Sequence, residues 1–297
     1  MTPEVSVLVC TYRRPAALTA CLESLLAQSS ERRREVVVVD NDPARSGEAA
    51  VASLRARFDR TGMALVYDCE PTPGIASARN RSVALARGEL LALLDDDETA
   101  EPGWLDRLLR PLDDAGVDGV FGPVLPRFPR GFPRYLVTSE LFQRPSFADG
   151  ERVPETACKT GNAALRRRAL SERPGPFQPA VGRMGEDTEL FAWLARRGCV
   201  FRWCADAIVH EEQEAVRGRW RWHLARGFWS GRSWAYQLLV DKPGWRGRAL
   251  TIASVGTGSI KLIARALDQR DNPRGAVLFL LRGLASQAGK LARLAGR

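Results

Sequence analysis

The sequence lacks the features that mark several classes of protein. It contains no uninterrupted apolar run of the roughly 18–20 residues that a transmembrane helix needs, because arginine and lysine interrupt the nearest stretches, 249–267 and 275–291. Its first residues show neither the basic nor the apolar region of a signal peptide, so we expect no export. Its six cysteines form no CxxC pair and show no zinc-like spacing with the two histidines, which indicates reduced cysteines in a cytosolic protein.

Positive charge is distributed unevenly along the 297 residues. Residues 1–212 contain 28 basic against 31 acidic residues, a net charge of −3, whereas residues 213–297 contain 16 against 4, a net charge of +12. The charged and apolar fractions, 27% and 45%, are typical of a globular protein and exclude wholesale disorder. The overall charge of +9 therefore comes from residues 213–297.

Short apolar runs alternate with helical patterns over the first hundred residues. Runs that are apolar along their whole length are typical of strands covered by helices on both faces of a sheet. The pattern predicts an α/β fold whose sheet is parallel at least in this half. The predicted strands are Val5–Cys10, Glu35–Asp40, Ala64–Tyr67 and Glu89–Leu94, and the predicted helices between them are 16–28, 47–57 and 77–86.

The patterns after residue 100 are less regular. They predict a helix over 102–109, a strand over 119–125, a long surface or lid segment over 126–154, a helix over 188–197 and a final strand pair within 200–209. The composition then changes after His210 to Trp/Arg-rich and later to Gly/Ala/Leu/Arg-rich segments. We therefore expect one domain over 1–212 and a basic helical extension over 213–297.

Three consecutive aspartates, Asp95, Asp96 and Asp97, follow the fourth predicted strand. Open α/β sheets bind ligands at the carboxyl ends of their strands. Adjacent carboxylates repel one another, and a divalent cation such as Mg²⁺ or Mn²⁺, usually shared with substrate phosphates, relieves that repulsion. We expect Asp97 to bind the metal and Asp95 or Asp96 to face a nucleotide sugar; the alternative is an acidic turn that caps the next helix.

Polar residues also follow the first two predicted strands. Asp40 ends the second strand, where a carboxylate can accept hydrogen bonds from a base or a ribose, and Thr11 and Arg13 follow the first. An arginine at this edge of the sheet can lie near a diphosphate. The alternatives are an aspartate that caps its own loop and a solvated arginine.

Four segments, in this order and spacing, resemble the nucleotide-binding half of family 2 glycosyltransferases: VSVLVCTYRRP, VVVVDND, GIASARNRSVALARGE and LLALLDDDE. The resemblance continues through TGNAALRR and MGEDTELFAWLARRGCVFRWCADAIVHE and covers about residues 4–235. LLDDDETAEPGWL, FGPVLPRFP and GEDTELF with WSGRSWAY resemble, more narrowly, glucosyltransferases of the succinoglycan-biosynthesis type. The family has the GT-A fold, a Rossmann-like nucleotide-sugar-binding sheet, and a DxD-type metal motif.

The resemblance implies roles for residues of the donor site. It implies that Asp40 contacts uracil and that Arg79 contacts the pyrimidine or phosphate region of a UDP-sugar. It places Asp95 or Asp96 on the ribose and donor sugar, and it assigns Asp97 to the divalent cation.

The resemblance also implies that Glu186 and Asp187 supply the catalytic base of an inverting transfer. Asp187 would take the proton from the acceptor hydroxyl as that oxygen attacks the anomeric carbon. Glu186 would bind the acceptor or orient the loop, and residues 182–185 would be a flexible lead-in. Capping of the following helix is the alternative for both carboxylates.

Two further positions match the family less specifically. His210 stands where the family often has a histidine that ligates the metal or contacts phosphate, although a lone histidine is more often structural. Gly161 and Asn162 resemble the family's sugar-site turn and would contact the acceptor or donor sugar, although a Gly-Asn turn can equally have no chemistry.

Residues 216–236 interleave arginines with aromatic residues. This pattern is found in single-stranded nucleic-acid sites, in helices at a membrane surface, and in helices that simply pack on a domain. We favour a surface-lying helical extension that holds the enzyme on the inner face of the cell membrane, without nucleic acid. The acceptor would then be a lipid-linked or cell-surface saccharide; the alternatives are a soluble secondary metabolite and, remotely, a nucleic-acid-binding module.

Overall fold

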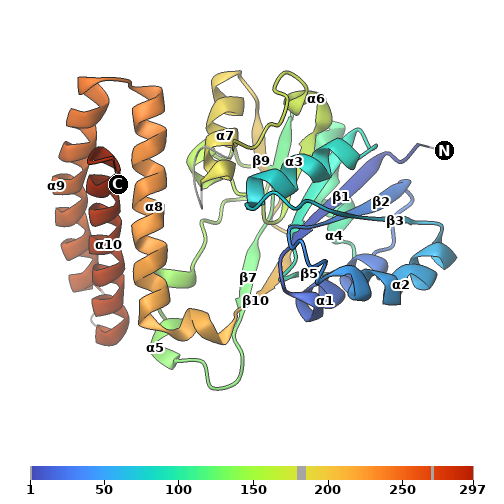
Figure 1. Ribbon diagram of the computed structural model, residues 1–297, viewed down its shortest axis with the longest axis horizontal. Coiled ribbons are helices and arrows are strands. Elements are labelled where there is room, and N and C mark those ends of the chain that lie inside the picture. Colours follow the sequence, from blue (N-terminus) through green and yellow to red (C-terminus); the bar gives the residue numbers. More distant parts are fainter. Residues whose placement is uncertain (1, 179–184, 269–270, 297) are drawn as a thin grey trace. The chain divides into compact units, whose positions relative to one another are not determined.

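The computed structural model describes residues 2–178, 185–268 and 271–296, which divide into two compact units (Figure 1). The first unit contains the described residues within 1–127, 144–179 and 186–212. The second contains those within 128–143, 180–185 and 213–297. Residues 128–143, from the middle of the expected lid segment, thus belong to the helical unit and not to the sheet.

A seven-stranded sheet forms the centre of the first unit. The strand order is β3-β2-β1-β4-β8-β6-β9. Strands β3, β2, β1 and β4 pair with one another in parallel, as predicted, whereas β8 runs antiparallel to both β4 and β6. The strands are β1 (Val5–Thr11), β2 (Arg34–Asp40), β3 (Ala64–Cys69), β4 (Leu90–Asp95), β6 (Gly119–Phe121), β8 (Ala163–Arg166) and β9 (Phe201–Trp203).

A second, three-stranded sheet has the order β5-β10-β7, with strands β5 (Glu98–Ala100), β7 (Val124–Arg127) and β10 (Val209–Glu212). The predicted single strand over 119–125 is wrong, because Gly122 and Pro123 divide it into β6 and β7, which join different sheets. The predicted strand pair within 200–209 is also wrong, since β9 and β10 join different sheets too. Proline cannot donate to a sheet ladder, which favours a break at Pro123.

Helices cover both faces of the large sheet. Alternate residues of a strand point to opposite faces, so Val5, Val7 and Val9 of β1 enter one apolar core and Leu8 enters the other. Helices α1 (Pro15–Leu26), α2 (Glu48–Thr61) and α4 (Trp104–Leu109) supply the first core, and α3 (Ile75–Leu85) and α7 (Glu186–Arg196) supply the second. The predicted α/β class is confirmed. Shorter elements are η1 (Arg110–Asp113), η3 (Glu155–Ala157) and α6 (Arg167–Leu170).

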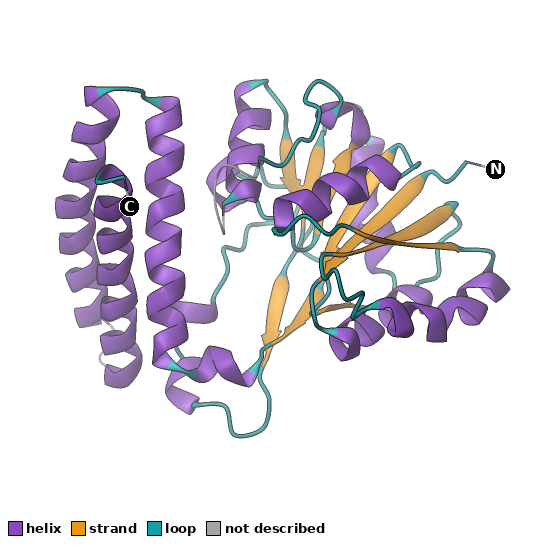
Figure 2. Cartoon of the chain, in the orientation of Figure 1, coloured by secondary structure: helices purple, strands orange, loops and turns teal. Residues whose placement is uncertain are grey.

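Three long helices make up most of the second unit (Figure 2). They are α8 (Trp220–Asp241), α9 (Trp245–Asp268) and α10 (Pro273–Leu294), preceded by α5 (Arg134–Val137), η2 (Glu140–Phe142) and η5 (Ala215–Gly218). Helices α8 and α10 pack at backbone distance: a Cβ added at Gly231 would lie 1.9 Å from the Ser286 carbonyl oxygen, and one at Gly227 would lie 2.3 Å from that of Arg282. Gly227 and Gly231, the two glycines of GFWSG, therefore allow α8 and α10 to approach this closely.

Helix α9 is the one helix among the described residues that is long and apolar enough to cross a membrane. Its most apolar window has a mean hydropathy of 1.2, and 6% of that window is buried. Length and composition alone are weak support for a span, but the low burial shows that α9 is not an ordinary core helix.

Candidate active site

The carboxyl ends of the central parallel strands bring most of the predicted donor-site residues to one edge of the sheet. In the strand register, Thr11 of β1 lies opposite Asp40 of β2, and Cys10 lies opposite Asp95 of β4. Asp96 and Asp97 form the tight turn between β4 and β5. This is the edge at which open α/β sheets bind their ligands.

Asp96 and Asp97 converge on one cationic group. Nη1 of Arg14 lies 3.1 Å from Oδ1 of Asp96 and 3.2 Å from Oδ2 of Asp97. Burial raises the pKa of Asp96 above its usual value, although Arg14 and a 2.7 Å hydrogen bond from the Thr11 hydroxyl oppose the shift. The two carboxylates thus already share a positive charge, and this oxygen-rich donor set fits a divalent cation.

Arg79 joins the donor edge to the Glu186-Asp187 pair. Its Nη1 donates to Oε1 of Glu186, and its Nη2 lies 3.3 Å from Oδ1 of Asp95. Burial lowers the pKa of Arg79, but the surrounding carboxylates, Asp95 first, outweigh burial and leave the pKa above its ordinary value. The predicted contact of Arg79 with pyrimidine or phosphate stays a prediction. What the structure shows is a buried guanidinium between two carboxylates.

Asp187 lies in the first turn of α7 and is more accessible than its neighbour. The side chain of Glu186 is buried, whereas that of Asp187 is 16% exposed. Oδ1 of Asp187 accepts a 2.6 Å hydrogen bond from the Thr188 amide, and its Oδ2 lies 3.7 Å from Nζ of Lys159. Residues 182–184 of the predicted flexible lead-in lie outside the described residues.

Asp40 is buried inside its own loop. One carboxylate oxygen accepts from the Asp42 amide at 2.9 Å, and the other accepts from the Gly47 amide at 2.6 Å and the Tyr67 hydroxyl at 3.1 Å. Arg13 pairs with Asp42 at 3.2 Å and is largely exposed. The loop-capping alternative thus accounts for the Asp42 and Gly47 contacts of the Asp40 carboxylate, and its predicted contact with uracil stays a prediction.

Gly161 and Asn162 separate into different roles. The buried Asn162, with φ of 54°, donates through Nδ2 to the carbonyls of Pro123 and Ala207 and accepts from Nε1 of Trp104. Its side chain therefore ties the framework together, and the predicted sugar contact of Asn162 stays a prediction. A Cβ at Gly161 would lie 2.6 Å from Oε1 of Glu98, so glycine is what allows the chain to pass this close to the carboxylates.

His210 lies on β10 and contacts a glutamate of the segment that follows β5. Its Nε2 is 2.8 Å from Oε1 of Glu101, and it pairs with Thr99 across the small sheet. The next residue, Glu211, points to the opposite face and meets Arg144 at 2.9 Å. The structure thus places the His210 ring beside Glu101, and its predicted contact with a metal or a phosphate stays a prediction.

Sequence reasoning missed Arg14, Arg144 and Lys159 and gave Glu98 no role. Glu98 is fully buried; its Oε2 accepts from the Asp95 amide at 3.1 Å, and its Oε1 lies 3.9 Å from Nη1 of Arg144. Arg14 stands beside Arg13 in TYRRP, so the motif offered both arginines and only the fold distinguishes them. Arg144 comes from a segment without any motif, and nothing in the sequence pointed to it.

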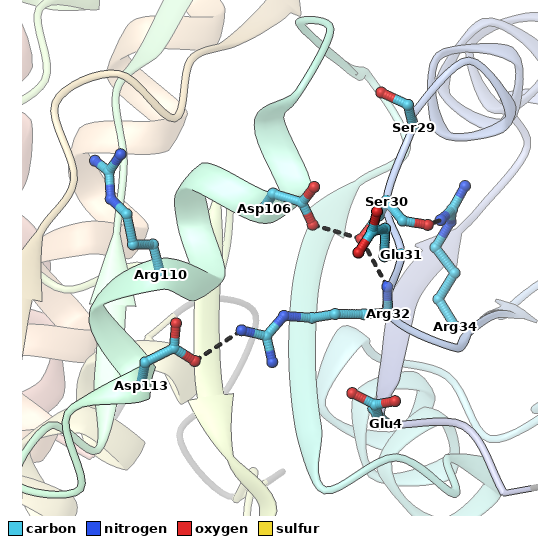
Figure 3. Close-up of a pocket in the computed structure, with 9 residues that line it drawn as sticks. All are labelled: Glu4, Ser29, Ser30, Glu31, Arg32, Arg34, Asp106, Arg110 and Asp113. Atoms are coloured by element: carbon cyan, nitrogen blue, oxygen red, sulfur yellow. Dashed lines mark hydrogen bonds and ion pairs between the residues drawn. The ribbon is translucent and has the colours of Figure 1, made fainter.

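A broad hollow lies at the other end of the sheet (Figure 3). Glu4 precedes β1, and Arg34 begins β2, so the hollow borders the amino ends of the strands. One ion pair joins two of its lining residues, the 2.7 Å contact between Arg32 and Asp113. Neither its position nor its residues match the ligand edge of an α/β sheet.

Comparison with known proteins identifies the family to which this chain belongs. A family model described as "Glycosyl transferase family 2" matches residues 6–173, more than half of the chain. The chain belongs to glycosyltransferase family 2. The predicted family and the predicted glycosyltransferase class of enzyme are thereby confirmed.

Two relatives match most of the chain. The succinoglycan biosynthesis protein ExoM of Rhizobium meliloti is 35% identical over 264 residues, which span 87% of this chain and 82% of that protein. The glucosyl-dolichyl phosphate glucuronosyltransferase of Haloferax volcanii is 27% identical over 246 residues, 77% of this chain and 76% of that protein.

Solved structures of glycosyltransferases share the fold. The mannosyltransferase PcManGT from Pyrobaculum calidifontis, in complex with GDP-Man and Mn²⁺, superposes with a TM-score of 0.63 at 22% identity, over 98% of this chain and 88% of that chain. Residues 1–349 of S. aureus TarS, in complex with UDP, superpose with a TM-score of 0.55 at 14% identity, over 99% of this chain and 92% of that chain. These likenesses confirm the GT-A fold of this family 2 glycosyltransferase.

Proposed function

We propose that this family 2 glycosyltransferase moves a hexose from a UDP-sugar to a saccharide hydroxyl during polysaccharide biosynthesis, and that it inverts the anomeric configuration. The observation that carries the proposal is Arg79, which joins Asp95 at the end of β4 to Glu186 at the start of α7. This contact supports a single site that contains the donor-side carboxylates and Asp187. The similarity to ExoM supports a role in polysaccharide biosynthesis, and the nucleotides bound in TarS and PcManGT support a nucleotide-sugar donor.

Asp187 is the base in the proposed mechanism. Glu186 is already paired with Arg79, so Asp187 is the more accessible carboxylate to take the proton from the acceptor hydroxyl. The hydroxyl oxygen attacks the anomeric carbon opposite the diphosphate through an oxocarbenium-like transition state, which inverts the centre. Glu186 and Arg79 keep the start of α7 fixed relative to β4.

Asp97 and Asp96 would hold a divalent cation, Mg²⁺ or Mn²⁺, in this proposal. When bound, the cation neutralises the negative charge of the departing diphosphate. The residues fit because two buried carboxylates already converge on a cationic nitrogen of Arg14. His210, whose Nε2 contacts Glu101, stays a candidate further ligand, and we assign the site to the aspartates first.

A donor panel tests the proposed reaction. The purified full chain is assayed with UDP- and GDP-hexoses for release of nucleoside diphosphate, with lipid-linked saccharides and with soluble acceptors in parallel. We expect turnover with a UDP-hexose and a lipid-linked saccharide, and at least about a tenfold loss of turnover in EDTA that Mn²⁺ or Mg²⁺ restores. Turnover that EDTA leaves unchanged would contradict the proposed metal dependence. A preference for GDP-sugars would contradict the proposed UDP-sugar donor, and a preference for a soluble acceptor would contradict the proposed lipid-linked acceptor.

The helical unit supports a second part of the proposal, peripheral binding to an anionic membrane surface. Helix α9 exposes an apolar stripe at helical spacing along its whole length: Trp245 is 74% exposed, Ile252 58%, Ile260 71%, Ile263 52% and Leu267 67%. Val277, Leu281, Leu284 and Leu291 form a similar exposed stripe on α10. Such stripes on helices that carry most of the net charge of +12 are typical of interfacial helices, with tryptophan at the headgroup level.

Vesicle sedimentation tests this surface. The double variant I260S/I263S removes two apolar side chains from the exposed stripe, and we expect it to bind phosphatidylglycerol-containing vesicles at least about tenfold more weakly than wild type. Binding should also weaken in high salt and on pure phosphatidylcholine. Leu125→Ser, at an exposed leucine of β7, is the matched control and should bind like wild type. Equal vesicle binding by I260S/I263S and wild type would contradict the proposal that the exposed stripe of α9 binds the membrane.

A further inference from the structure

Arg14 connects the first strand to the acidic turn in a way that the proposed mechanism does not use. It follows β1 and precedes Pro15, the first residue of α1. A single nitrogen, Nη1, lies 3.1 Å from Asp96 and 3.2 Å from Asp97. This one atom therefore contacts an oxygen of each carboxylate, as a bound cation would.

The burial of the three side chains is unequal. The carboxylates of Asp96 and Asp97 are 6% and 5% exposed, whereas the side chain of Arg14 is 36% exposed. Buried carboxylates are costly without a positive partner. The aspartates are thus the fixed part of the cluster, and Arg14 is a partner that reaches them from the solvent side.

Two cations cannot share these oxygens without strong repulsion. A divalent ion bound by Asp96 and Asp97 would lie within a few ångströms of the present position of the guanidinium, and like charges so close in a partly buried site are strongly unfavourable. The guanidinium and a divalent ion would therefore compete for these oxygens. The partial exposure of Arg14 gives it room to move, which the buried aspartates do not have.

We propose that Arg14 is a displaceable counter-ion, a positioning residue that holds Asp96 and Asp97 together in the metal-free enzyme and competes with the incoming divalent cation. The proposal rests on the metal site of the proposed function. Arg14 keeps the acidic turn folded when no metal is bound, and it weakens metal binding by the free energy needed to displace it.

Direct measurement of Mn²⁺ binding tests this role. Electron paramagnetic resonance of free Mn²⁺ gives the dissociation constant of the full chain, with and without UDP, for wild type, R14Q and R14K. We expect R14Q to bind Mn²⁺ on the order of tenfold more tightly than wild type, because both the competitor and its repulsion are gone. R14K keeps the charge and should stay near wild type. The control R57Q removes an exposed arginine that pairs with Glu23, and it should leave the affinity unchanged.

Thermal unfolding gives a second readout that needs no activity. In EDTA, R14Q should melt at a lower temperature than wild type, since its buried aspartates have lost their counter-ion. Saturating Mn²⁺ should close or reverse this gap, because a ligand that binds the folded state stabilises it. If R14Q does not fold without metal, it can be purified in Mn²⁺ and chelated stepwise for the same comparison.

The outcomes separate the two proposals. If wild type binds Mn²⁺ and R14Q binds it equally or more weakly, Arg14 supports the site instead of competing for it, and only this inference fails. If wild type binds no Mn²⁺ with or without UDP, the metal site of the proposed function fails and the role of Arg14 fails with it.

Discussion

Replacing Asp187 with asparagine is expected to lower kcat for sugar transfer by about 10²–10⁴-fold while the fold and donor binding persist. An amide cannot take the proton of the acceptor hydroxyl. The buried Glu186 cannot substitute, because its carboxylate is paired with Arg79. The asparagine side chain can still accept the hydrogen bond that the Thr188 amide gives to Oδ1 of Asp187, so the first turn of α7 should stay intact. Release of nucleoside diphosphate and formation of product, measured side by side, give the loss.

The matched control for this variant is Asp113→Asn, the same chemical change at an exposed aspartate of η1 that pairs with Arg32. It should keep full activity. Affinity for the nucleoside diphosphate, measured by calorimetry, should be similar in D187N, D113N and wild type. Wild-type kcat in D187N would show that another group takes the proton, and loss of donor binding in D187N would point to a role in the donor site.

The variant Arg79→Gln is expected to lower the free energy of unfolding by about 3–5 kcal/mol near neutral pH. Arg79 is buried between Asp95 and Glu186, and its removal leaves the Glu186 carboxylate buried without its cationic partner. Urea denaturation at neutral pH measures the change. The control is Arg81→Gln on the same helix, since Arg81 is exposed and its pair with Asp68 should contribute less than about 1 kcal/mol.

The effect of Arg79→Gln should depend on pH. Burial raises the pKa of Glu186 above its ordinary value of 4.5, and Arg79 opposes that shift. A carboxyl group with a raised pKa in the folded state stabilises the fold at low pH, and this contribution is lost as pH rises through the folded-state pKa. Without Arg79 the pKa of Glu186 rises further, so the deficit of R79Q should be small near pH 4.5 and grow as the pH rises above it. A deficit independent of pH would show that lost packing dominates.

The sequence by itself determined the local elements and the family. The apolar runs of β1, β2 and β4 are nearly continuous, and each is followed by a polar residue, so the strands and the ligand edge could be predicted from neighbouring residues alone. Helices α1 to α4 likewise follow from spacing, within a few residues at their ends. The aspartate run and the order of the motifs were sufficient to predict the α/β class and glycosyltransferase family 2.

Only the tertiary structure decided which charged groups meet. Arg79 and Glu186 are 107 residues apart, and Arg14 and Asp96 are 82 apart, so no local pattern links them. Residues adjacent in sequence also take different roles: Arg14 meets the aspartates, whereas Arg13 pairs with Asp42.

The same holds for the backbone that frames the site. Asn162 is a framework residue because β8 runs antiparallel between β4 and β6, which brings its amide to the carbonyls of Pro123 and Ala207. Strand patterns report burial and alternation, which are local, whereas strand order and side-chain pairing depend on how the chain crosses itself. For this enzyme the sequence determined the chemistry present at the sheet edge, and the fold determined which of those groups neutralise one another and which stay accessible to a substrate.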